Sequence, residues 1–494
     1  MTRAEFLRTL GIGAAGVAGA VTGLGRVSQA SAQTLTGEVA VYPTGQYPFD
    51  LHEVGAAVNG GTGPSGRSYP GGGVVRLKAT NDVGTPMFFN FGDGTSSPAR
   101  GSVAVTRDVV IVGELTGTTT MTFPNGHVPD SDFTPDRTVV YGGKRAFACP
   151  AENSVPTTLA VRNIYFAYPS LAAVQVRKSA GLEVSDCVIY DVEWDATGLG
   201  FSVAVGVEAT GLAQANPELF GDYRVMNNRI RRAAPTTSPV NFFVADTGIV
   251  MNLSSMNGQI IGNEIDRFAF VGIGIDRNNG TVTIAGNYVS RCGYGGYLTS
   301  AGIGARGTSM PVFIERNQVT GGDVGPGLRS KNGLSLSSSN VVVRSNSVEG
   351  VVSQDGVLLT SFTPPPSGPT YTASNNVIEK NRLIELAAGR SQVFIDVACN
   401  GNRSANNDYG EVAVGGVAGM VVSSNDNQLV NEDFWGAYSG VNGSPSLPCV
   451  WLTEGSNGNQ ISALKYQGAP QGFDVCIQVR NEGTNAVNGA ERCK

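Results

Sequence analysis

Short runs of alternating apolar and polar residues return along most of the chain, and many of them lead into an asparagine. Nine triplets of the form Asn-x-(Ile/Val/Leu) recur at intervals of 24 to 46 residues between residues 228 and 487, usually with an aliphatic residue three positions before them. This alternation predicts two short strands that share an inward face across a one-residue corner. Each triplet therefore predicts one coil of a solenoid, with all nine asparagines in one column. The triplets begin at Asn228, Asn263, Asn287, Asn317, Asn346, Asn381, Asn427, Asn459 and Asn485.

A third strand in each coil is marked by a glycine and a further alternation. Examples are Gly272-Ile273-x-Ile275, Gly302-Ile303-x-Ala305 and Gly333-Leu334-x-Leu336. Three strands per coil predict three parallel sheets around a narrow apolar core, in which the other two sides of a coil serve as the crossover. A stacked asparagine suits such a corner because its amide donates and accepts hydrogen bonds along the stack.

This pattern resembles the right-handed parallel β-helix of the pectin lyase-like superfamily over roughly residues 38–487. The segment Phe49 to Asn59 resembles the short capping helix of that superfamily. The resemblance implies an all-β fold, a right-handed parallel β-helix of about eleven coils at roughly 4.8 Å each, with an N-terminal capping helix. It leaves the chemistry open, because the superfamily holds lyases, hydrolases, epimerases, esterases and non-catalytic surface proteins.

The first 32 residues have the features of an export signal. Arg3 and Arg8 precede a Gly/Ala-rich apolar run, and Ala30-Ser31-Ala32 offers a small-residue cleavage site. The start resembles the twin-arginine motif but has Ala4 in place of the second arginine, so the Sec route stays open. The run is too short for a membrane anchor. We therefore expect an exported chain, periplasmic or extracellular.

Residues 33–494 are expected to form a single β-helix domain, because a solenoid grows by adding coils and remains one unit. An N-terminal cap with irregular coils is expected over 33–156, and regular coils over 157–494. Seven cysteines in an exported chain permit disulfides, and Cys449 and Cys476 fall close in register. The oligomeric state is not defined by these patterns.

The balance of charge excludes two classes of partner. The net charge is −6, and removal of residues 1–32, which hold three arginines and one glutamate, makes it −8. An acidic chain without a basic stripe argues against nucleic acid and anionic membrane surfaces.

The position after the last apolar residue of the third strand forms an outward column on successive coils. In-register residues on neighbouring coils lie about 4.8 Å apart, so Asp276 and Arg306 are expected to be neighbours that form an ion pair. On the strand before the asparagine, Glu315, Arg344 and Glu379 alternate in charge, which predicts structural pairing. The first column consists of Asn252, Asp276, Arg306, Ser337, Thr360 and Asp396.

Long links between the second and third strands, at residues 290–302 and 320–333, are expected beside this column. Loops grafted on one edge of a rigid stack form binding surfaces. Aromatic rings for sugar faces, with basic residues for carboxylates, suit an acidic polysaccharide. The candidate catalytic residues are Asp276, Arg306, Arg329 and Lys331, and the candidate substrate-binding residues are Arg291, Tyr294, Tyr297 and Asp323.

Two chemistries fit such a surface. A uronate lyase needs a base near the sugar C5 and a group that neutralises the carboxylate, for which Arg306, Arg329 and Lys331 are candidates. A hydrolase needs paired carboxylic acids. The polygalacturonase signatures and the pectate lyase motif Trp-x-Asp-His are absent. A non-catalytic carbohydrate-binding or envelope protein is therefore the alternative. The candidate acids are Asp276, Asp323, Asp355 and Asp396.

Two further segments bear on the site. Residues 124–136 hold several carboxylates, including Asp130 and Asp132, which could bind Ca²⁺ through hard oxygen ligands, although no established ligand spacing is met. Residues 361–375 contain three consecutive prolines between Phe362 and Tyr371. This stiff excursion could wall a groove, or it could be an insertion that the solenoid tolerates.

Overall fold

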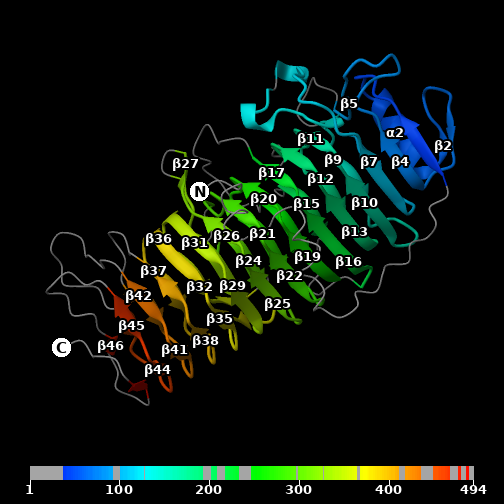
Figure 1. Ribbon diagram of the computed structural model, residues 1–494. Coiled ribbons are helices and arrows are strands. Elements are labelled where there is room, and N and C mark those ends of the chain that lie inside the picture. The colour runs from blue at the N-terminus through cyan, green and yellow to red at the C-terminus, as the bar shows by residue number, and fades with distance from the viewer. Residues whose placement is uncertain are drawn as a thin grey trace.

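The computed structural model shows an elongated solenoid of short strands, with an α-helix at its N-terminal end (Figure 1). The predicted capping helix is confirmed as α2 (Phe49–Asn59). Its residues Leu51, Val54 and Val58 are buried in the core of the rod. The structure describes residues 37–92, 101–126, 128–192, 202–208, 217–232, 246–295, 299–325, 328–363, 368–410, 418–435, 449–467, 477–479 and 485–488.

The first of three long parallel sheets has 15 strands. In β22, Val282 and Ile284 are buried while Thr283 is half-buried. This alternation is what a strand shows when one of its faces packs on the core. The strands are β1 (Glu38–Val41), β4 (Gly73–Leu77), β7 (Val109–Gly113), β10 (Thr157–Arg162), β13 (Ser179–Ser185), β16 (Leu219–Met226), β19 (Ser255–Ile261), β22 (Val282–Ala285), β25 (Val312–Glu315), β30 (Val341–Arg344), β35 (Val377–Glu379), β38 (Arg403–Ala405), β41 (Gln428–Val430), β44 (Gln460–Ser462) and β47 (Ala486–Asn488).

The second sheet has 13 strands, most of them short because the chain bends again soon after the asparagine corner. The middle residue of such a strand points into the core, as Ile230, Ile265 and Val289 do. The strands are β5 (Phe89–Asn90), β8 (Val139–Tyr141), β11 (Tyr165–Ala167), β14 (Val188–Tyr190), β17 (Arg229–Arg231), β20 (Glu264–Asp266), β23 (Tyr288–Ser290), β26 (Gln318–Thr320), β31 (Ser347–Val352), β36 (Arg382–Ala388), β39 (Asp408–Tyr409), β42 (Asp433–Trp435) and β45 (Lys465–Gln467).

The third sheet also has 13 strands and carries the predicted glycine-led alternation, in which Ile273 and Ile275 are buried. The strands are β6 (Ser102–Ala104), β9 (Arg145–Cys149), β12 (Ala172–Val176), β15 (Ser202–Glu208), β18 (Asp246–Asn252), β21 (Val271–Asp276), β24 (Ala301–Arg306), β29 (Asn332–Ser337), β32 (Asp355–Leu359), β37 (Ser391–Ile395), β40 (Ala418–Val422), β43 (Val450–Leu452) and β46 (Ile477–Val479).

The predicted fold class, an all-β parallel β-helix, is confirmed. Sheets of 15, 13 and 13 strands contain more coils than the eleven or so that we expected. The estimate was low because it left out the coils of β1, β4, β7 and β38, which lack the triplet. Among the described residues, no helix has the length and apolar character needed to cross a bilayer.

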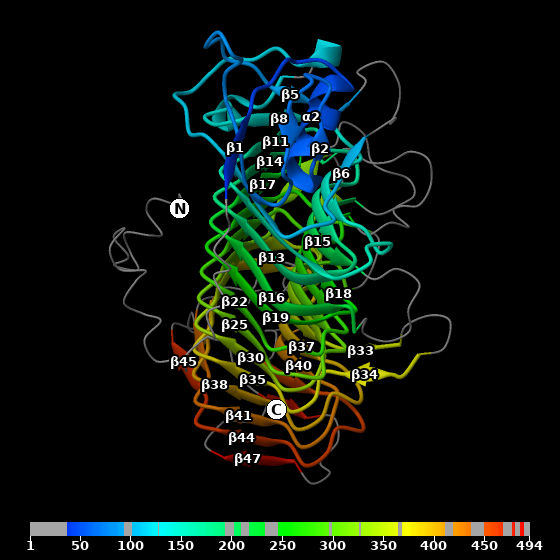
Figure 2. The same ribbon diagram turned by 90° about the vertical axis from the view of Figure 1, so that its right-hand side faces the viewer.

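Short elements leave the coils at several points. Figure 2 shows β33 and β34 at one side of the rod, where they form a two-stranded antiparallel hairpin. The short elements are the antiparallel pairs β2 (Gly61–Thr62) with β3 (Ser68–Tyr69), β27 (Asp323–Gly325) with β28 (Leu328–Arg329) and β33 (Ser361–Phe362) with β34 (Tyr371–Thr372), and the 3₁₀ helices η1 (Pro124–Gly126) and η2 (Ser131–Phe133).

The corner asparagines form two ladders, so the expectation of one column is wrong for Asn427, Asn459 and Asn485. Those three precede strands of the first sheet, whereas the earlier triplets precede strands of the second sheet. The same triplet suits both corners, because in each case the second residue after the asparagine points into the core. The first ladder contains Asn228, Asn263, Asn287, Asn317, Asn346, Asn381 and Asn407, and the second contains Asn376, Asn402, Asn427, Asn459 and Asn485.

Each ladder joins neighbouring coils through buried amides. The Asn317 Oδ1 accepts hydrogen bonds from the backbone N–H of Asn287 at 3.0 Å and from its Nδ2 at 2.9 Å. The Asn317 Nδ2 in turn donates to the Ile284 carbonyl at 2.9 Å. The first ladder ends at Glu432, whose carboxylate accepts the Asn407 N–H at 2.8 Å. The ladders thereby satisfy backbone groups that the corners would otherwise leave buried without a partner.

The glycine that opens each third strand has a steric cause, which a substitution can test. A Cβ at Gly302 would lie 2.5 Å from the Val319 Cγ1 and 2.9 Å from the Gly333 carbonyl oxygen. We expect Gly302→Ala to lower the free energy of unfolding by about 1–3 kcal/mol, the usual cost of overpacking. Gly117→Ala is the control, since a Cβ there meets nothing within 4 Å. Equal unfolding curves in denaturant for the two variants would contradict this explanation.

Candidate functional site

The outward column on the third sheet lies where the sequence predicted it. Asn252, Asp276, Arg306 and Ser337 stand in register on β18, β21, β24 and β29. The Arg306 Nη2 donates to the Asp276 Oδ2 at 3.2 Å. The predicted ion pair between these two residues is therefore confirmed.

Two aromatic rings hold the Arg306 guanidinium. Its central carbon lies 5.2 Å from the centre of the Phe270 ring and 4.6 Å from that of the Phe362 ring. Asp276, which is only 8% exposed, also accepts a hydrogen bond from the Arg277 Nε at 3.2 Å. We call Phe270, Asp276, Arg277, Arg306 and Phe362 the Arg306 cluster. The rings and the carboxylate fix the guanidinium in one orientation.

The hairpin β33–β34 brings Phe362 to this cluster. Its second strand places the Tyr371 ring over Gly307, where a Cβ would lie 2.9 Å from the ring and 3.0 Å from the Arg277 Cγ. Gly307 also has a φ of +59°, which favours glycine. The proline-rich excursion therefore packs against the site residues. Sequence reasoning did not assign Phe362 or Phe270 to the site, although the aromatic residues beside the proline run were a usable signal.

Small and polar side chains surround the cluster on the outer face of the sheet. Gly274, Gly304 and Ser335 occupy the central outward position of three successive strands. The hydroxyls of Ser335 and Ser337 are buried, as is the Asn252 Oδ1, and none of the three atoms has a hydrogen-bond partner within the described part of the chain. A buried polar atom without a partner costs free energy, so the packing here leaves hydrogen-bonding capacity unused.

The residues predicted on the first long link separate in the structure. Arg291 forms an ion pair with Asp266, with its Nε donating to the Asp266 Oδ1 at 2.9 Å. Tyr294 is buried under β27 and β28, where it packs with Ala269 and Val324. Tyr297 lies outside the described residues. Arg291 and Tyr294 therefore support the wall of the stack and do not join the Arg306 cluster.

The residues predicted on the second long link lie at the edge of the third sheet where its strands begin, whereas Arg306 lies where they end. Arg329 and Asp323 pair across the exposed β27–β28 hairpin, with the Arg329 Nε donating to the Asp323 Oδ1 at 2.8 Å. Lys331 directly precedes β29, whereas Arg306 ends the neighbouring strand β24. Burial lowers the pKa of the Lys331 amine. The four candidate catalytic residues thus fall into three places, and only Asp276 and Arg306 are in contact.

The candidate acids for hydrolysis each have a different partner. Burial raises the pKa of Asp355, and its ion pair with Arg390, whose Nε donates at 3.0 Å, opposes that rise. Asp396 accepts a hydrogen bond from the Thr360 Oγ1 at 2.8 Å. Since Asp276 and Asp323 pair with arginines, no two of these four described carboxylates form a pair of acids.

Two other charged groups are structural. Glu315, Arg344 and Glu379 form the predicted pairing column, with Arg344 contacting both glutamates. In the loop considered for calcium, Asp132 pairs with Arg231 at 2.7 Å, and Asp136 pairs with Arg137 at 2.6 Å. Within the described ranges, no group of three or more His, Cys, Asp or Glu side chains is arranged to hold a metal ion.

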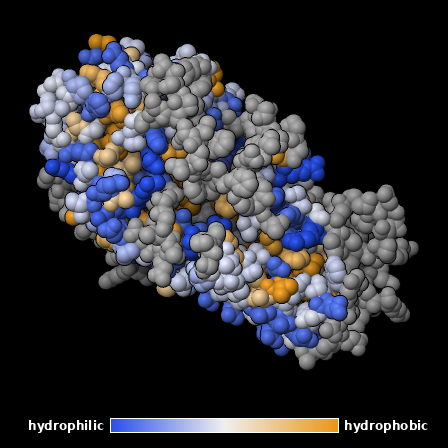
Figure 3. Space-filling model, turned by 180° about the vertical axis from the view of Figure 1, so that it is seen from behind, coloured by the Kyte–Doolittle hydropathy of each residue, from blue (hydrophilic) through white to orange (hydrophobic). Residues whose placement is uncertain are grey.

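Figure 3 shows, on the side opposite Figure 1, hydrophilic and hydrophobic residues mixed in small patches along the rod.

Several solved structures are similar to this chain. Protein-family models and curated proteins give no match. DFA-IIIase from Arthrobacter chlorophenolicus A6, in complex with GF2, is similar at a TM-score of 0.40 and 13% identity, covering 89% of this chain and 88% of that one. The Dettilon tailspike protein is similar at a TM-score of 0.39 and 10% identity, covering 82% of this chain and 68% of that one. Alginate lyase from Paenibacillus sp. str. FPU-7 is similar at a TM-score of 0.34 and 10% identity, covering 69% of this chain and 94% of that one. The chain is a parallel β-helix protein, and its own residues define its candidate site.

Proposed function

We propose that this protein binds an extracellular acidic polysaccharide along the outer face of the third sheet, with Arg306 at a sugar carboxylate. The observation that carries the proposal is the contact of the Arg306 guanidinium with both the Phe270 and Phe362 rings. A planar guanidinium binds a carboxylate through two parallel N–H donors. Among the described residues, Arg306 donates only to Asp276 through Nη2, which leaves about four of its five N–H groups for a ligand.

The local charge of the Arg306 cluster favours an anionic sugar. Asp276 pairs with both Arg277 and Arg306, each at 3.2 Å. Within the cluster, two guanidinium groups face one carboxylate, so the cluster carries one positive charge although the chain is acidic. Because the rings already restrict the Arg306 side chain, binding costs less conformational entropy than it would for a freely rotating arginine.

The next strand of the third sheet places two small side chains beside the cluster. Ser337 neighbours Arg306 in register, and Ser335 lies two residues earlier on the same strand. Both hydroxyls are buried, whereas the Arg306 side chain is 21% exposed, so a ligand on this face would contact the guanidinium. We also propose that the protein meets the polysaccharide outside the cytoplasm. This part of the proposal rests on the export signal predicted in residues 1–32, which lie outside the described residues.

A uronate lyase is the second candidate, and Lys331 favours it. Burial lowers the pKa of this amine, which makes the neutral, basic form easier to reach. Lys331 and Ser337 bracket β29, so a sugar chain that follows this strand over roughly 20 Å would meet both the base and the Arg306 cluster. A substrate as long as β29 could therefore contact both Lys331 and Arg306, although these two residues do not contact each other.

Retention of an acidic polysaccharide tests the binding proposal. The affinity for polygalacturonate and alginate, measured by titration calorimetry, is expected to fall by about tenfold or more in Arg306→Gln, because a charge-assisted bidentate contact is lost. The control is Arg344→Gln, which removes a half-exposed arginine from an ion pair on the first sheet and should leave affinity unchanged. Equal affinities for wild type and Arg306→Gln would reject the proposed role.

The same titrations separate binding from cleavage. A lyase produces an ultraviolet-absorbing unsaturated uronate, and a hydrolase produces reducing ends without that absorbance. We expect any absorbance signal to disappear in Lys331→Met, whereas Arg329→Met, which changes the exposed hairpin, should retain it. Binding without either product would leave the polysaccharide-binding function and reject the lyase candidate.

A further inference from the structure

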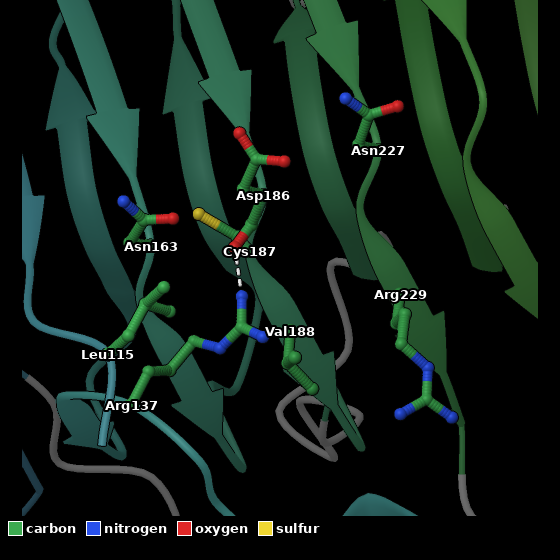
Figure 4. Close-up of a pocket in the computed structure, with 8 residues that line it drawn as sticks. All are labelled: Leu115, Arg137, Asn163, Asp186, Cys187, Val188, Asn227 and Arg229. Carbon is green, nitrogen blue, oxygen red and sulfur yellow. Dashed lines mark hydrogen bonds between the residues drawn. The ribbon is translucent and has the colours of Figure 1, made fainter. Parts of the chain in front are cut away.

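A cavity lies at the corner between the first and second sheets, away from the Arg306 cluster. It has a volume of about 370 Å³, which is within the range of roughly 300–1,000 Å³ typical of small-molecule sites. Figure 4 shows Asn163, Asp186 and Asn227 side by side above Arg137, with Leu115 at one side and Arg229 at the other. The cavity therefore combines polar groups with an apolar rim.

The three polar residues occupy the same corner of three successive coils. Asn163, Asp186 and Asn227 have φ values of 55°, 54° and 56° and each follows a strand of the first sheet. Neighbouring coils place such residues about 4.8 Å apart. No hydrogen bond or ion pair of their side chains occurs within the described part of the chain, and Asp186 and Asn227 are exposed. They offer a row of two amides and one carboxylate to a ligand.

The two arginines in the cavity are already neutralised. Arg137 donates to both oxygens of Asp136, at 2.6 and 2.9 Å, and also to the Asp186 carbonyl. Arg229 pairs with Glu264 at 3.2 Å, and its guanidinium lies 4.4 Å from the centre of the Phe133 ring. These contacts fix the walls of the cavity. They also leave little positive charge to attract a carboxylate or a phosphate.

The rest of the lining is apolar. Cys187 and Val188 are buried beneath the row of polar residues, and Leu115 at the rim is 66% exposed. A ligand that matches this lining carries several hydroxyl groups on one side, for the amides and the carboxylate, and C–H groups on the other. A sugar ring without a charged substituent has that distribution.

We propose that this cavity is a second carbohydrate site, which takes one neutral sugar unit. Asp186 accepts hydrogen bonds from two sugar hydroxyls, Asn163 and Asn227 bond the flanking hydroxyls, and Leu115 covers one face of the ring. The site differs from the Arg306 cluster in the class of ligand that it binds. Its two arginines are paired with carboxylates, and its free groups are two neutral amides and the Asp186 carboxylate. It does not depend on the function proposed for the third sheet.

Saturation-transfer NMR of the full chain with glucose, glucuronate and glucosamine tests the proposal, because these probes differ by one group. Glucose is expected to bind, and Asp186→Ala is expected to weaken binding by about tenfold, since hydrogen bonds to a charged group are lost. Asp186→Asn keeps an acceptor and should retain binding within a few fold. Ser345→Ala is the matched control, because Ser345 has a φ of 56° at the same corner on a distant coil.

Three outcomes would overturn the proposal. One is the absence of any glucose signal with the wild-type protein, and another is an unchanged signal in Asp186→Ala. The third is a preference for glucosamine that is lost equally in Asp186→Asn and Asp186→Ala, which would define a site for cations. Retention of polygalacturonate by these variants reports on Arg306 separately, so failure at one site is distinguishable from failure at the other.

Discussion

Replacing Asn317 by alanine is expected to lower the free energy of unfolding by about 3–5 kcal/mol. The side chain accepts two hydrogen bonds from Asn287 and donates to Asn346 and to the Ile284 carbonyl. All of these groups are buried, so the substitution leaves several of them without a partner and without access to water. Each such group costs about 1–3 kcal/mol. Denaturant unfolding followed by circular dichroism measures the change.

An asparagine outside the rod provides the control. Asn431 lies on the outer side of the same corner, and its Nδ2 donates to the Asn406 Oδ1 at 2.6 Å on the surface. We expect Asn431→Ala to cost about 1 kcal/mol, because water replaces the lost bond. If Asn317→Ala costs no more than Asn431→Ala, the buried ladder does not hold the coils together.

Replacing Glu432 by glutamine is expected to stabilise the protein at neutral pH. Glu432 occupies the last position of the first ladder and is fully buried. Burial raises the pKa of its carboxyl from 4.5 to about 7. A shift of that size corresponds to roughly 3 kcal/mol, which is the cost of ionising the buried group. Glutamine keeps an oxygen for the Asn407 N–H and carries no charge.

The sign of the pH dependence follows from the raised pKa. Between pH 4.5 and about 7 the folded chain holds a proton on Glu432 that the unfolded chain has released. The contribution of Glu432 to stability is therefore complete below pH 4.5 and is lost as the pH rises through the folded pKa. The difference in unfolding free energy between Glu432→Gln and wild type should be near zero at about pH 4 and should approach roughly 3 kcal/mol above pH 7.

A surface glutamate separates this effect from a general change of charge. Among the described residues, Glu379 makes only long ion pairs, at 4.0 Å to Arg344 and 3.8 Å to Arg403. Glu379→Gln is expected to change the free energy of unfolding by less than about 1 kcal/mol. A difference for Glu432→Gln that stays constant from low to neutral pH would mean that the carboxyl does not titrate in this range.

The strand pattern was predictable because alternation reports burial directly. Ile284 and Ile275 face the core, and a repeat of constant geometry turns such positions into a register, which placed Asp276 beside Arg306 correctly. The two ladders were not separable from the triplet alone. Asn381 and Asn427 have the same local sequence pattern. The pairs Asn376 with Asn381 and Asn402 with Asn407 show that two successive coils carry asparagines at both corners.

The surroundings of the site were less predictable, because they depend on where excursions dock. Phe362 reaches Arg306 only through the path of the β33–β34 hairpin, and nothing in its sequence spacing fixes that path. Lys331 and Arg329 lie close to Arg306 in the order of coils, yet they sit at the other end of the strand. Strand register predicts which residues lie side by side on neighbouring coils. It does not predict where a loop packs, and that determines which residues meet at the site.

A crystal structure of the protein with a bound acidic oligosaccharide would show directly whether Arg306 binds a sugar carboxylate. We expect a sugar chain on the outer face of the third sheet, with a carboxylate within hydrogen-bond distance of the Arg306 guanidinium. An oligosaccharide bound to another face, with Arg306 contacting only Asp276 and the two phenylalanine rings, would contradict it.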